Sequence, residues 1–195
     1  GGLRSALLGS VALHCTSHAP APVLVVHPAP ADGTVEPRIV VGVDGSAESR
    51  AALAAALDEA SRSGAGVEVV AAYDVADYWT DLSTVVVPPP DEGRKQVRRQ
   101  TEALVEEALA SRPGPAPSVR VHVVDGPAGY ALVHRASGAQ LLVVGSRGHG
   151  ALSGLLLGSV ALHCAMHAQA PVLVVRPSRT AAVADAAREP APAQG

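Results

Sequence analysis

Five short runs of Val, Leu and Ile recur along the chain, and a segment long enough to hold a helix separates each run from the next. The runs lie at residues 38–44, 67–73, 119–124, 141–144 and 172–175. Continuous apolar runs of this length are typical of strands buried on both faces, and helix-sized connections between them favour parallel pairing with right-handed crossovers. The sequence therefore predicts an α/β fold of order βαβαβαβαβ, with a five-stranded parallel sheet between two layers of helices.

The segments between these runs carry helical patterns. Ser46 is a preferred N-cap residue, and it opens a segment whose apolar residues recur at helical spacing. The segment at residues 91–111 holds a basic cluster that consists of Arg94, Lys95, Arg98 and Arg99. Pairs such as Arg98 and Glu102, however, have the i,i+4 spacing of a solvated, salt-bridged helix face. Its charges therefore do not favour nucleic-acid binding. Helices are expected at residues 46–60, 91–111, 128–136 and 159–167.

An internal repeat organises the ends of the chain. Residues 1–28 align with residues 150–177 without a gap and match at roughly 20 of 28 positions, far above chance. A secretion signal has no reason to be copied within a chain, so the first segment is interpreted as the closing helix and strand of a second copy of the unit. The sequence also lacks an initiator Met, and we expect a fragment or a truncated tandem.

The repeat divides the chain into four parts. Residues 1–28 are the remnant of an upstream unit, and residues 29–36 have the Pro- and Gly-containing composition of a linker. Residues 37–177 form one complete unit. Residues 178–195 end in a Pro/Ala run and are expected to be a disordered tail.

Composition narrows the classes of function. Hydrophobic residues make up 48% of the chain, enough for a sizeable core, but aromatic residues make up only 2% and Phe is absent. Aromatic platforms that stack nucleic-acid bases are therefore not expected. The net charge of −3 gives no strong field for nucleic acid or for an anionic membrane. Two cysteines cannot form a disulfide framework, and a cytoplasmic location is expected.

The most informative stretch is rich in glycine and follows the fourth strand. Gly145 and Gly148 come first, and after nine intervening residues Gly158 and Ser159 follow. Glycines after a buried strand let backbone N–H groups approach a phosphate, and the start of the next helix can bind the same anion. Short glycine patterns also occur where a chain only turns, and both interpretations stay open at this point. Gly145 and Asp44 both follow strands, so the topology predicts that they are neighbours.

Residues 37–177 resemble the universal stress protein family. The resemblance is carried by residues 41–46, 141–148, 158–161 and 171–177. In the ATP-binding branch of that family the signature is Gly-x2-Gly-x9-Gly-Ser/Thr, which the glycine-rich stretch satisfies. The resemblance implies a Rossmann-like fold related to the adenine nucleotide alpha hydrolases, ATP as the ligand with Mg²⁺ on its phosphates, and a role in stress response. Residues 1–28 resemble the tail of a second such domain.

The resemblance also implies a set of site residues. Asp44 would lie near the adenosine, although its carboxylate could instead only cap the following turn. The backbone of Val70 and Ala71 would line the adenine pocket, and the glycine-rich loop would surround the phosphates. The predicted nucleotide-binding residues are Gly42, Val43, Asp44, Val70, Ala71, Gly145, Ser146, Arg147, Gly148, Gly158, Ser159 and Val160.

A metal site is an alternative use for one helix. His163 and His167 share a helix face beside Cys164, but a metal would need further ligands there, and the resemblance implies none. A packed, partly polar helix face is favoured, and no metal is predicted.

In the family the last strand commonly pairs with that of another domain. Residues 22–27 are therefore predicted to pair with residues 171–176, within one chain or in a homodimer, because an open Val-rich edge favours association.

Three functions are compatible with these features. The leading hypothesis is a nucleotide-dependent signalling module without dedicated catalysis, because no nucleophile, base and acid stand out as a set. The second is a slow ATP hydrolase, which turnover above background would reveal. The third is an interaction protein whose nucleotide site is vestigial, which would bind a partner but no ATP.

Overall fold

The computed structural model describes residues 9–27, 35–73, 90–148 and 157–177 of the 195-residue chain. The expected tail at 178–195 and most of the expected linker lie outside these residues. The expected strands and helices are all found, with ends that differ by at most about one helical turn. In chain order they are α1 (Ser10–His18), β1 (Val23–Val25), β2 (Glu36–Gly42), α2 (Ala47–Ser63), β3 (Gly66–Tyr73), α3 (Pro90–Ala110), β4 (Val119–Asp125), α4 (Ala128–Arg135), β5 (Ala139–Gly145), α5 (Ser159–His167) and β6 (Val172–Val175).

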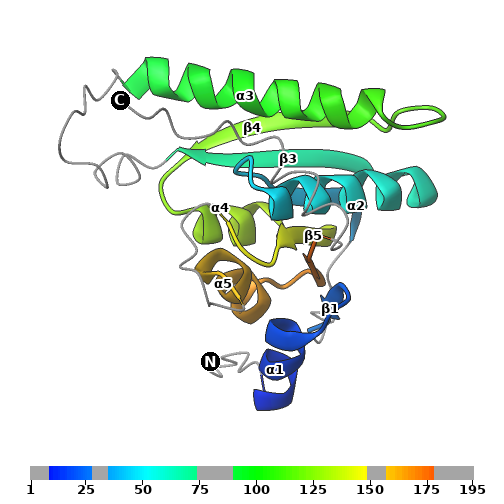
Figure 1. The fold of residues 1–195 in the computed structure, drawn as a ribbon, viewed down its shortest axis with the longest axis vertical. Coiled ribbons are helices and arrows are strands. Elements are labelled where there is room, and N and C mark those ends of the chain that lie inside the picture. Colours follow the sequence, from blue (N-terminus) through cyan, green and yellow to red (C-terminus); the bar gives the residue numbers. More distant parts are fainter. Residues whose placement is uncertain (1–8, 28–34, 74–89, 149–156, 178–195) are drawn as a thin grey trace, which may run out of the picture.

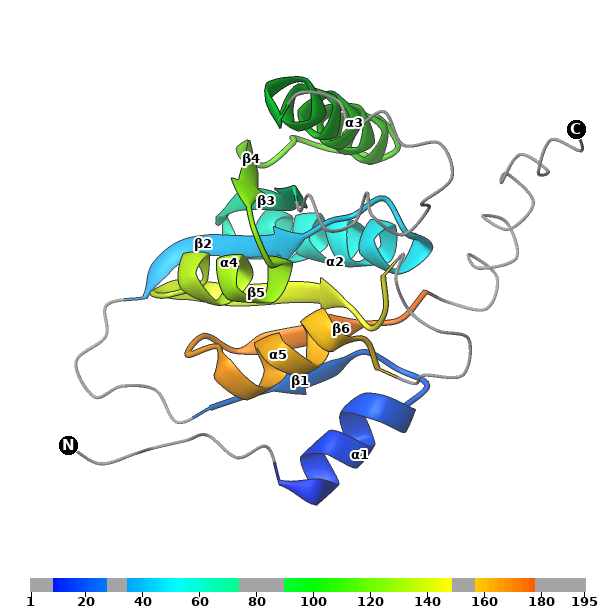
Figure 2. The same ribbon diagram turned by 90° about the vertical axis from the view of Figure 1, so that its left-hand side faces the viewer.

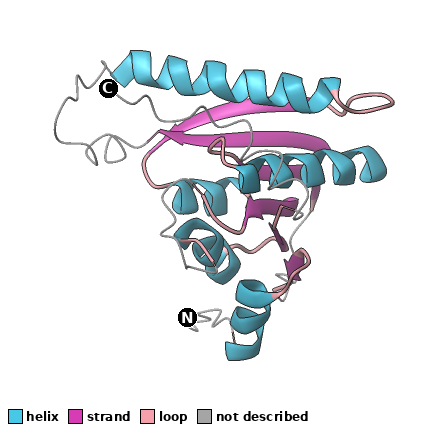
Figure 3. Ribbon diagram, in the orientation of Figure 1, coloured by secondary structure: helices cyan, strands magenta, loops and turns pink. Residues whose placement is uncertain are grey.

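The strands form one sheet in the order β1-β6-β5-β2-β3-β4. Strands β2 to β6 are parallel, which confirms the predicted five-stranded sheet and its α/β fold. A sixth strand, β1, joins antiparallel at the edge beside β6, with Leu24 opposite Leu173. The predicted pairing of residues 22–27 with 171–176 therefore occurs within the chain. Figures 1 and 3 show β1 and α1 at one end of the sheet and α3 over the other end.

Helices cover both faces of the sheet, as Figure 2 shows. Helices α2 and α3 pack on one face through side chains such as Leu53, Leu57 and Leu104. Helices α4 and α5 pack on the other through Leu132, Ala161 and neighbouring small residues. The valine-rich strands supply core side chains to both faces of the sheet, because alternate side chains of a strand point in opposite directions. None of the described helices is both long enough and apolar enough to cross a membrane.

Local sequence fixes the ends of α2, which begins beside the carboxyl end of β2. The Ser46 hydroxyl accepts a hydrogen bond from the Ser49 N–H at 3.2 Å, which confirms Ser46 as the N-cap. The helix stops at Gly64, whose φ of 72° is left-handed backbone that glycine adopts without steric cost. The Ser46 cap places the first turn of α2 against the turn that follows β2.

Candidate functional site

Two strand ends and one helix start converge at the carboxyl edge of the sheet. Strands β2 and β5 are neighbours, with Val41 opposite Val143, so the turn after β2 lies beside the loop after β5. That loop runs from Gly145 to Gly148 within the described residues, and Gly158 returns to it at the start of α5. The structure thus brings together the segments that the topology predicted to be neighbours.

Gly148 faces Asp44 across this edge. A Cβ placed on Gly148 would lie 2.4 Å from Asp44 Oδ2, closer than two such atoms can approach. A glycine is therefore required here for the carboxylate to keep its position. The other oxygen, Oδ1, accepts hydrogen bonds from the Ser46 N–H at 3.0 Å and from the Ser46 hydroxyl at 2.6 Å. Asp44 therefore does cap its own turn, as the alternative interpretation held, while its second oxygen points to the glycine-rich loop.

Gly145 is packed against the first turn of α2. A Cβ at this position would lie 2.8 Å from the backbone carbonyl carbon of Glu48 and 2.9 Å from its Cβ. The obstacle is helix backbone, which cannot move aside as a flexible side chain can. This glycine therefore allows α2 to approach β5, and its role is close packing between two elements of the site.

Ser146 and Gly158 join the loop to α5. The Gly158 N–H donates to the Ser146 carbonyl at 2.7 Å, and the Ser146 N–H donates to the Val175 carbonyl at 2.8 Å. Ser146 is 1% exposed, and among the described residues its hydroxyl has no hydrogen-bond partner. A buried hydroxyl without a hydrogen-bond partner has lost its hydrogen bonds to water and has not replaced them. A bound group or water at this point would therefore stabilise it.

The N-terminus of α5 opens onto the same place. Its N-cap is Gly158, which has no side chain to accept a hydrogen bond from the first turn. The N–H groups of Ser159, Val160 and Ala161 therefore lack intrahelical acceptors, as in the first turn of any helix. Together with the positive end of the helix dipole, these N–H groups favour an anion.

Charged side chains border the loop. Arg147 forms an ion pair with Glu48, with Nε and a terminal nitrogen at 2.9 Å and 2.8 Å from Oε1. Burial, with repulsion from the Arg147 guanidinium, lowers the pKa of Arg176, while the Glu48 carboxylate raises it. Arg176 therefore lies close enough to Glu48 and Arg147 to feel their charges. Two guanidinium groups and two carboxylates, of which Asp44 is the second, thus surround the loop.

Two of these charged residues were not among the predicted site residues. Glu48 is an acidic residue in the first turn of α2, and it contacts both Gly145 and Arg147. Arg176 directly follows β6, so its place at the end of a strand was the signal that could have found it.

The remaining predicted residues lie in the sheet behind this edge. The Val43 N–H donates to the Val70 carbonyl at 2.9 Å, and both side chains are buried. Ala71 is buried on the other face of β3 from Val70, in the layer under α2 and α3. A Cβ on Gly42 would lie 2.8 Å from Leu132, so this glycine makes room for α4. The side chains of Val70 and Ala71 therefore belong to the core, and only their backbone could contact a ligand.

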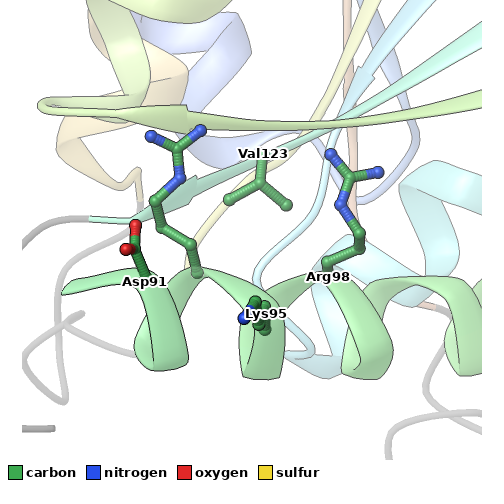
Figure 4. Close-up of a pocket in the computed structure, with 5 residues that line it drawn as sticks. Asp91, Lys95, Arg98 and Val123 are labelled. Carbon is green, nitrogen blue, oxygen red and sulfur yellow. The ribbon is translucent and has the colours of Figure 1, made fainter. Parts of the chain in front are cut away.

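A cavity of about 320 Å³ lies elsewhere, between α3 and β4. Figure 4 shows Asp91 and Arg98 extending from α3 on the side of Val123 of β4, with Lys95 between them on the same helix. Arg94, which also lines it, pairs with Asp125 at 2.6 Å, and Arg98 pairs with Glu102 at 3.6 Å. The second pair confirms the predicted i,i+4 ion pair, and these pairs partly neutralise the basic cluster.

The histidine face of α5 is packed against α4. The His163 ring lies 4.4 Å from the Tyr130 ring and 4.6 Å from the His167 ring, measured between centroids. Among the residues that the structure describes, no three His, Cys, Asp or Glu side chains are grouped so that they could hold a metal ion. Burial raises the pKa of Cys164 to about 12, so its thiol stays protonated at neutral pH.

Comparisons with a family model and with curated proteins identify the same family. A family model described as the universal stress protein family matches residues 37–176. A universal stress protein of Mycobacterium tuberculosis is 40% identical over 186 residues, which cover 91% of this chain and 59% of that protein. The chain thus matches about three fifths of the length of this relative.

Two solved structures extend the likeness to three dimensions. A universal stress protein in complex with cAMP is 30% identical, with a TM-score of 0.52, and the match covers 74% of this chain and 99% of that one. A universal stress protein of Pseudomonas aeruginosa, described there as putative, has a TM-score of 0.64 at 21% identity. That match covers 96% of this chain and 63% of the other, and it supports the fold alone.

Proposed function

Because this chain belongs to the universal stress protein family, we propose that it binds an adenine nucleotide where β2, β5 and α5 meet, and that it signals through the bound state. The observation that carries the proposal is the buried Ser146 hydroxyl, which has no hydrogen-bond partner in the described part of the chain and belongs to the residue whose carbonyl contacts the uncapped N-terminus of α5. A phosphate would satisfy both the hydroxyl and the first-turn N–H groups. The complex of a 30% identical relative with cAMP supports an adenine nucleotide as the ligand class.

The loop suits phosphates better than a neutral ligand. The N–H groups of Ser159 and Val160 would donate to phosphate oxygens, and the Ser159 hydroxyl adds a further donor at the same helix end. Arg147 lies at the loop and would add a cation, although its pairing with Glu48 limits the charge that it offers. The resemblance assigns ATP, with Mg²⁺ bound through the phosphates, and we retain this as the proposed ligand.

Asp44 suits the sugar instead of the phosphates. Its Oδ2 faces Gly148, and a carboxylate accepts hydrogen bonds from the hydroxyl groups of a ribose but repels a phosphate. The adenine would then lie toward the end of β3, where the backbone of Val70 and Ala71 was predicted to line the pocket. This order of base, ribose and phosphates runs from β3 across β2 to the loop after β5, in agreement with the strand order.

A titration with a fluorescent ATP analogue tests the site. Ser146→Ala removes the hydroxyl without adding volume, and we expect the dissociation constant to rise about tenfold, the value of one hydrogen bond to a charged group. Ser159→Ala should also weaken binding, whereas Ser10→Ala, the same position in the first copy of the repeat, should not. Equal affinities for Ser146→Ala, Ser159→Ala and Ser10→Ala would contradict the proposed site.

The same titration separates the three functions considered from sequence. Competition by unlabelled ATP, AMP and cAMP ranks the nucleotides, and phosphate release measures turnover. We expect binding without turnover above the level of a Ser159→Ala control. Sustained release that Ser159→Ala abolishes would favour the slow hydrolase. Absence of binding to any of the three nucleotides would favour an interaction protein.

A further inference from the structure

The sheet has a second open edge, at β4, on the side opposite β1. Within the described residues β4 pairs with β3 alone, so its outer edge carries no further strand there. The outer edge of a strand presents unpaired N–H and C=O groups, which an added strand can use. None of the predicted nucleotide-binding residues lies in β4, so an interaction at this edge goes beyond the proposed function.

The hydrogen bonds of β4 identify the backbone groups that face outward. The Ser118 carbonyl accepts a hydrogen bond from β3 at 2.8 Å, and the Gly126 N–H donates one to β3 at 3.1 Å. Alternate residues of a strand direct their backbone groups to opposite sides, so the even-numbered positions of β4 face β3. Val121 and Val123 therefore direct theirs to the open edge. In agreement, a guanidinium nitrogen of Arg98 donates to the Val121 carbonyl from α3, at 3.4 Å.

Cationic side chains of α3 border the same edge. The charged residues that line the cavity between α3 and β4 recur at helical spacing and so share one side of α3 (Figure 4). They are Asp91, Arg94, Lys95 and Arg98, of which three are cations. Val123, which is 8% exposed, supplies an apolar surface to the same cavity. An excess of positive charge thus lies beside an open strand edge.

These cations can accept new partners. Arg94 pairs with Asp125 at 2.6 Å. Arg98 pairs with Glu102 at 3.6 Å. All four side chains are 44–63% exposed, and ion pairs between exposed side chains contribute little, because water competes for both charges. Lys95 forms no ion pair with any residue that the structure describes. A carboxylate from another molecule can therefore bind Lys95 directly and share the two arginines.

We propose that the outer edge of β4 binds an extended acidic segment of a partner protein, which adds to the sheet as a further strand. Its backbone would bond to the outward groups of Val121 and Val123. Alternate side chains of an added strand point to the α3 side, so a segment in which acidic and β-branched residues alternate would place its carboxylates at Arg94, Lys95 and Arg98. Arg98 would turn from the Val121 carbonyl to one of these carboxylates. The same cations repel a basic segment, which makes the edge selective.

The test uses a fluorescein-labelled peptide of seven residues, the length of β4, in which glutamate and valine alternate. Fluorescence anisotropy with the full chain measures its affinity, and amide hydrogen exchange followed by NMR reports on the backbone of β4. We expect saturable binding and slower exchange of the Val121 and Val123 amides in the complex, because an added strand would bond to them.

A matched pair of double variants separates this surface from general charge attraction. Lys95→Ala with Arg98→Ala should weaken binding about tenfold, through loss of two cations that contact the peptide. Arg99→Ala with Arg62→Ala removes the same charge from residues that do not line the cavity, and it should change the affinity by less than about twofold at 0.15 M salt, where charges beyond about 8 Å are screened. If the first double variant does not fold, Lys95→Ala alone, at an exposed position, should weaken binding about threefold.

Several results would overturn the proposal. Absence of saturable binding by the folded parent would do so, as would equal affinities of the two double variants or, in the single-variant test, of Lys95→Ala and the parent. Unchanged exchange of the Val121 and Val123 amides in the saturated complex would show attraction without strand addition. Equal binding of the same peptide with every backbone nitrogen methylated would show the same. Tighter binding of a single-stranded oligonucleotide, lost in the same variants, would assign the surface to nucleic acid and refute an acidic protein segment as its partner.

Discussion

Two glycines of the candidate site differ in what lies beside them, and alanine substitutions should separate packing from binding. A Cβ at Gly145 would lie 2.8 Å from the Glu48 backbone, so Gly145→Ala forces α2 away from β5. A Cβ at Gly148 would lie 2.4 Å from Asp44 Oδ2, the end of an exposed side chain that can rotate. The first change should therefore reduce stability, and the second should mainly displace the carboxylate.

The magnitudes follow from these contacts. Overpacking against backbone costs about 1–3 kcal/mol, so Gly145→Ala should lower the free energy of unfolding by that amount. For Gly148→Ala we expect less than about 1 kcal/mol, because only the Asp44 carboxylate must move and its hydrogen bonds to Ser46 are partly solvated. Affinity for ATP should fall about tenfold in Gly148→Ala, since the carboxylate would no longer face the ribose.

Urea unfolding followed by far-UV circular dichroism measures the free energy of unfolding, and the nucleotide titration measures the affinity for ATP. Gly9→Ala is the control for both, because nothing lies within 4 Å of a Cβ at Gly9. If the free energy of unfolding of Gly145→Ala lies within about 0.5 kcal/mol of the parent value, the close approach of α2 to β5 does not require a glycine at this position. If Gly148→Ala binds ATP as the parent does, Asp44 does not contact the ligand.

Three further predictions concern capping, thiol reactivity and pH. Ser46→Ala should reduce stability by about 1 kcal/mol in urea unfolding, through loss of the N-cap of α2, and an unchanged midpoint would contradict that role. Ellman's reagent should modify one thiol, Cys15, in the native protein at mildly alkaline pH, because burial raises the pKa of Cys164 to about 12; rapid reaction of both would contradict this. Burial lowers the pKa of His122 and of His163 below 6.5, with Arg135 contributing at His122 and His167 at His163. The unfolded chain then binds more protons below pH 6.5, so stability should fall as the pH drops through that value, and His163→Asn should reduce the slope.

The order of strands and helices along the chain could be expected from sequence, because each element carries its own local signal. The valine runs indicate strands without reference to the rest of the chain, and Ser46 and Gly64 mark the ends of α2 by local backbone chemistry. The pairing of β1 with β6 was predicted from the repeat together with the family resemblance, because the last strand of the family commonly pairs with that of another domain and the repeat supplies a second copy of it. The sheet therefore has six strands, one more than the complete unit supplies.

Contacts between distant residues could not be predicted in the same way. Glu68 lies within a valine run, yet it is buried and lies 3.4–3.5 Å from Arg38, Arg120 and Arg135, which come from three other elements. The pairing of Glu48 with Arg147 likewise depends on how α2 lies over β5. Side-chain partners of this kind follow from the packed geometry, and no local pattern in the sequence records them.

The glycine-rich loop is the intermediate case. Its residues could be selected from spacing, but the function of each depends on what the fold places beside it. Gly145 and Gly42 make room for helix packing, while Gly148 makes room for a carboxylate. The structure thus gives these glycines close contacts that spacing alone does not indicate, and phosphate binding by the loop stays a prediction.

The proposed nucleotide site is tested most directly by calorimetric titration of the full chain with Mg·ATP, using one matched pair of variants. A Cβ at Gly158 would lie 3.3 Å from Arg147 Cα, so Gly158→Val should push the loop out of place, whereas Gly9, the same position in the first copy, has open space around it. We predict saturable 1:1 binding by the parent and by Gly9→Val, and none by a folded Gly158→Val. No binding by the folded, nucleotide-free parent, or equal binding by all three proteins, would contradict the proposed site.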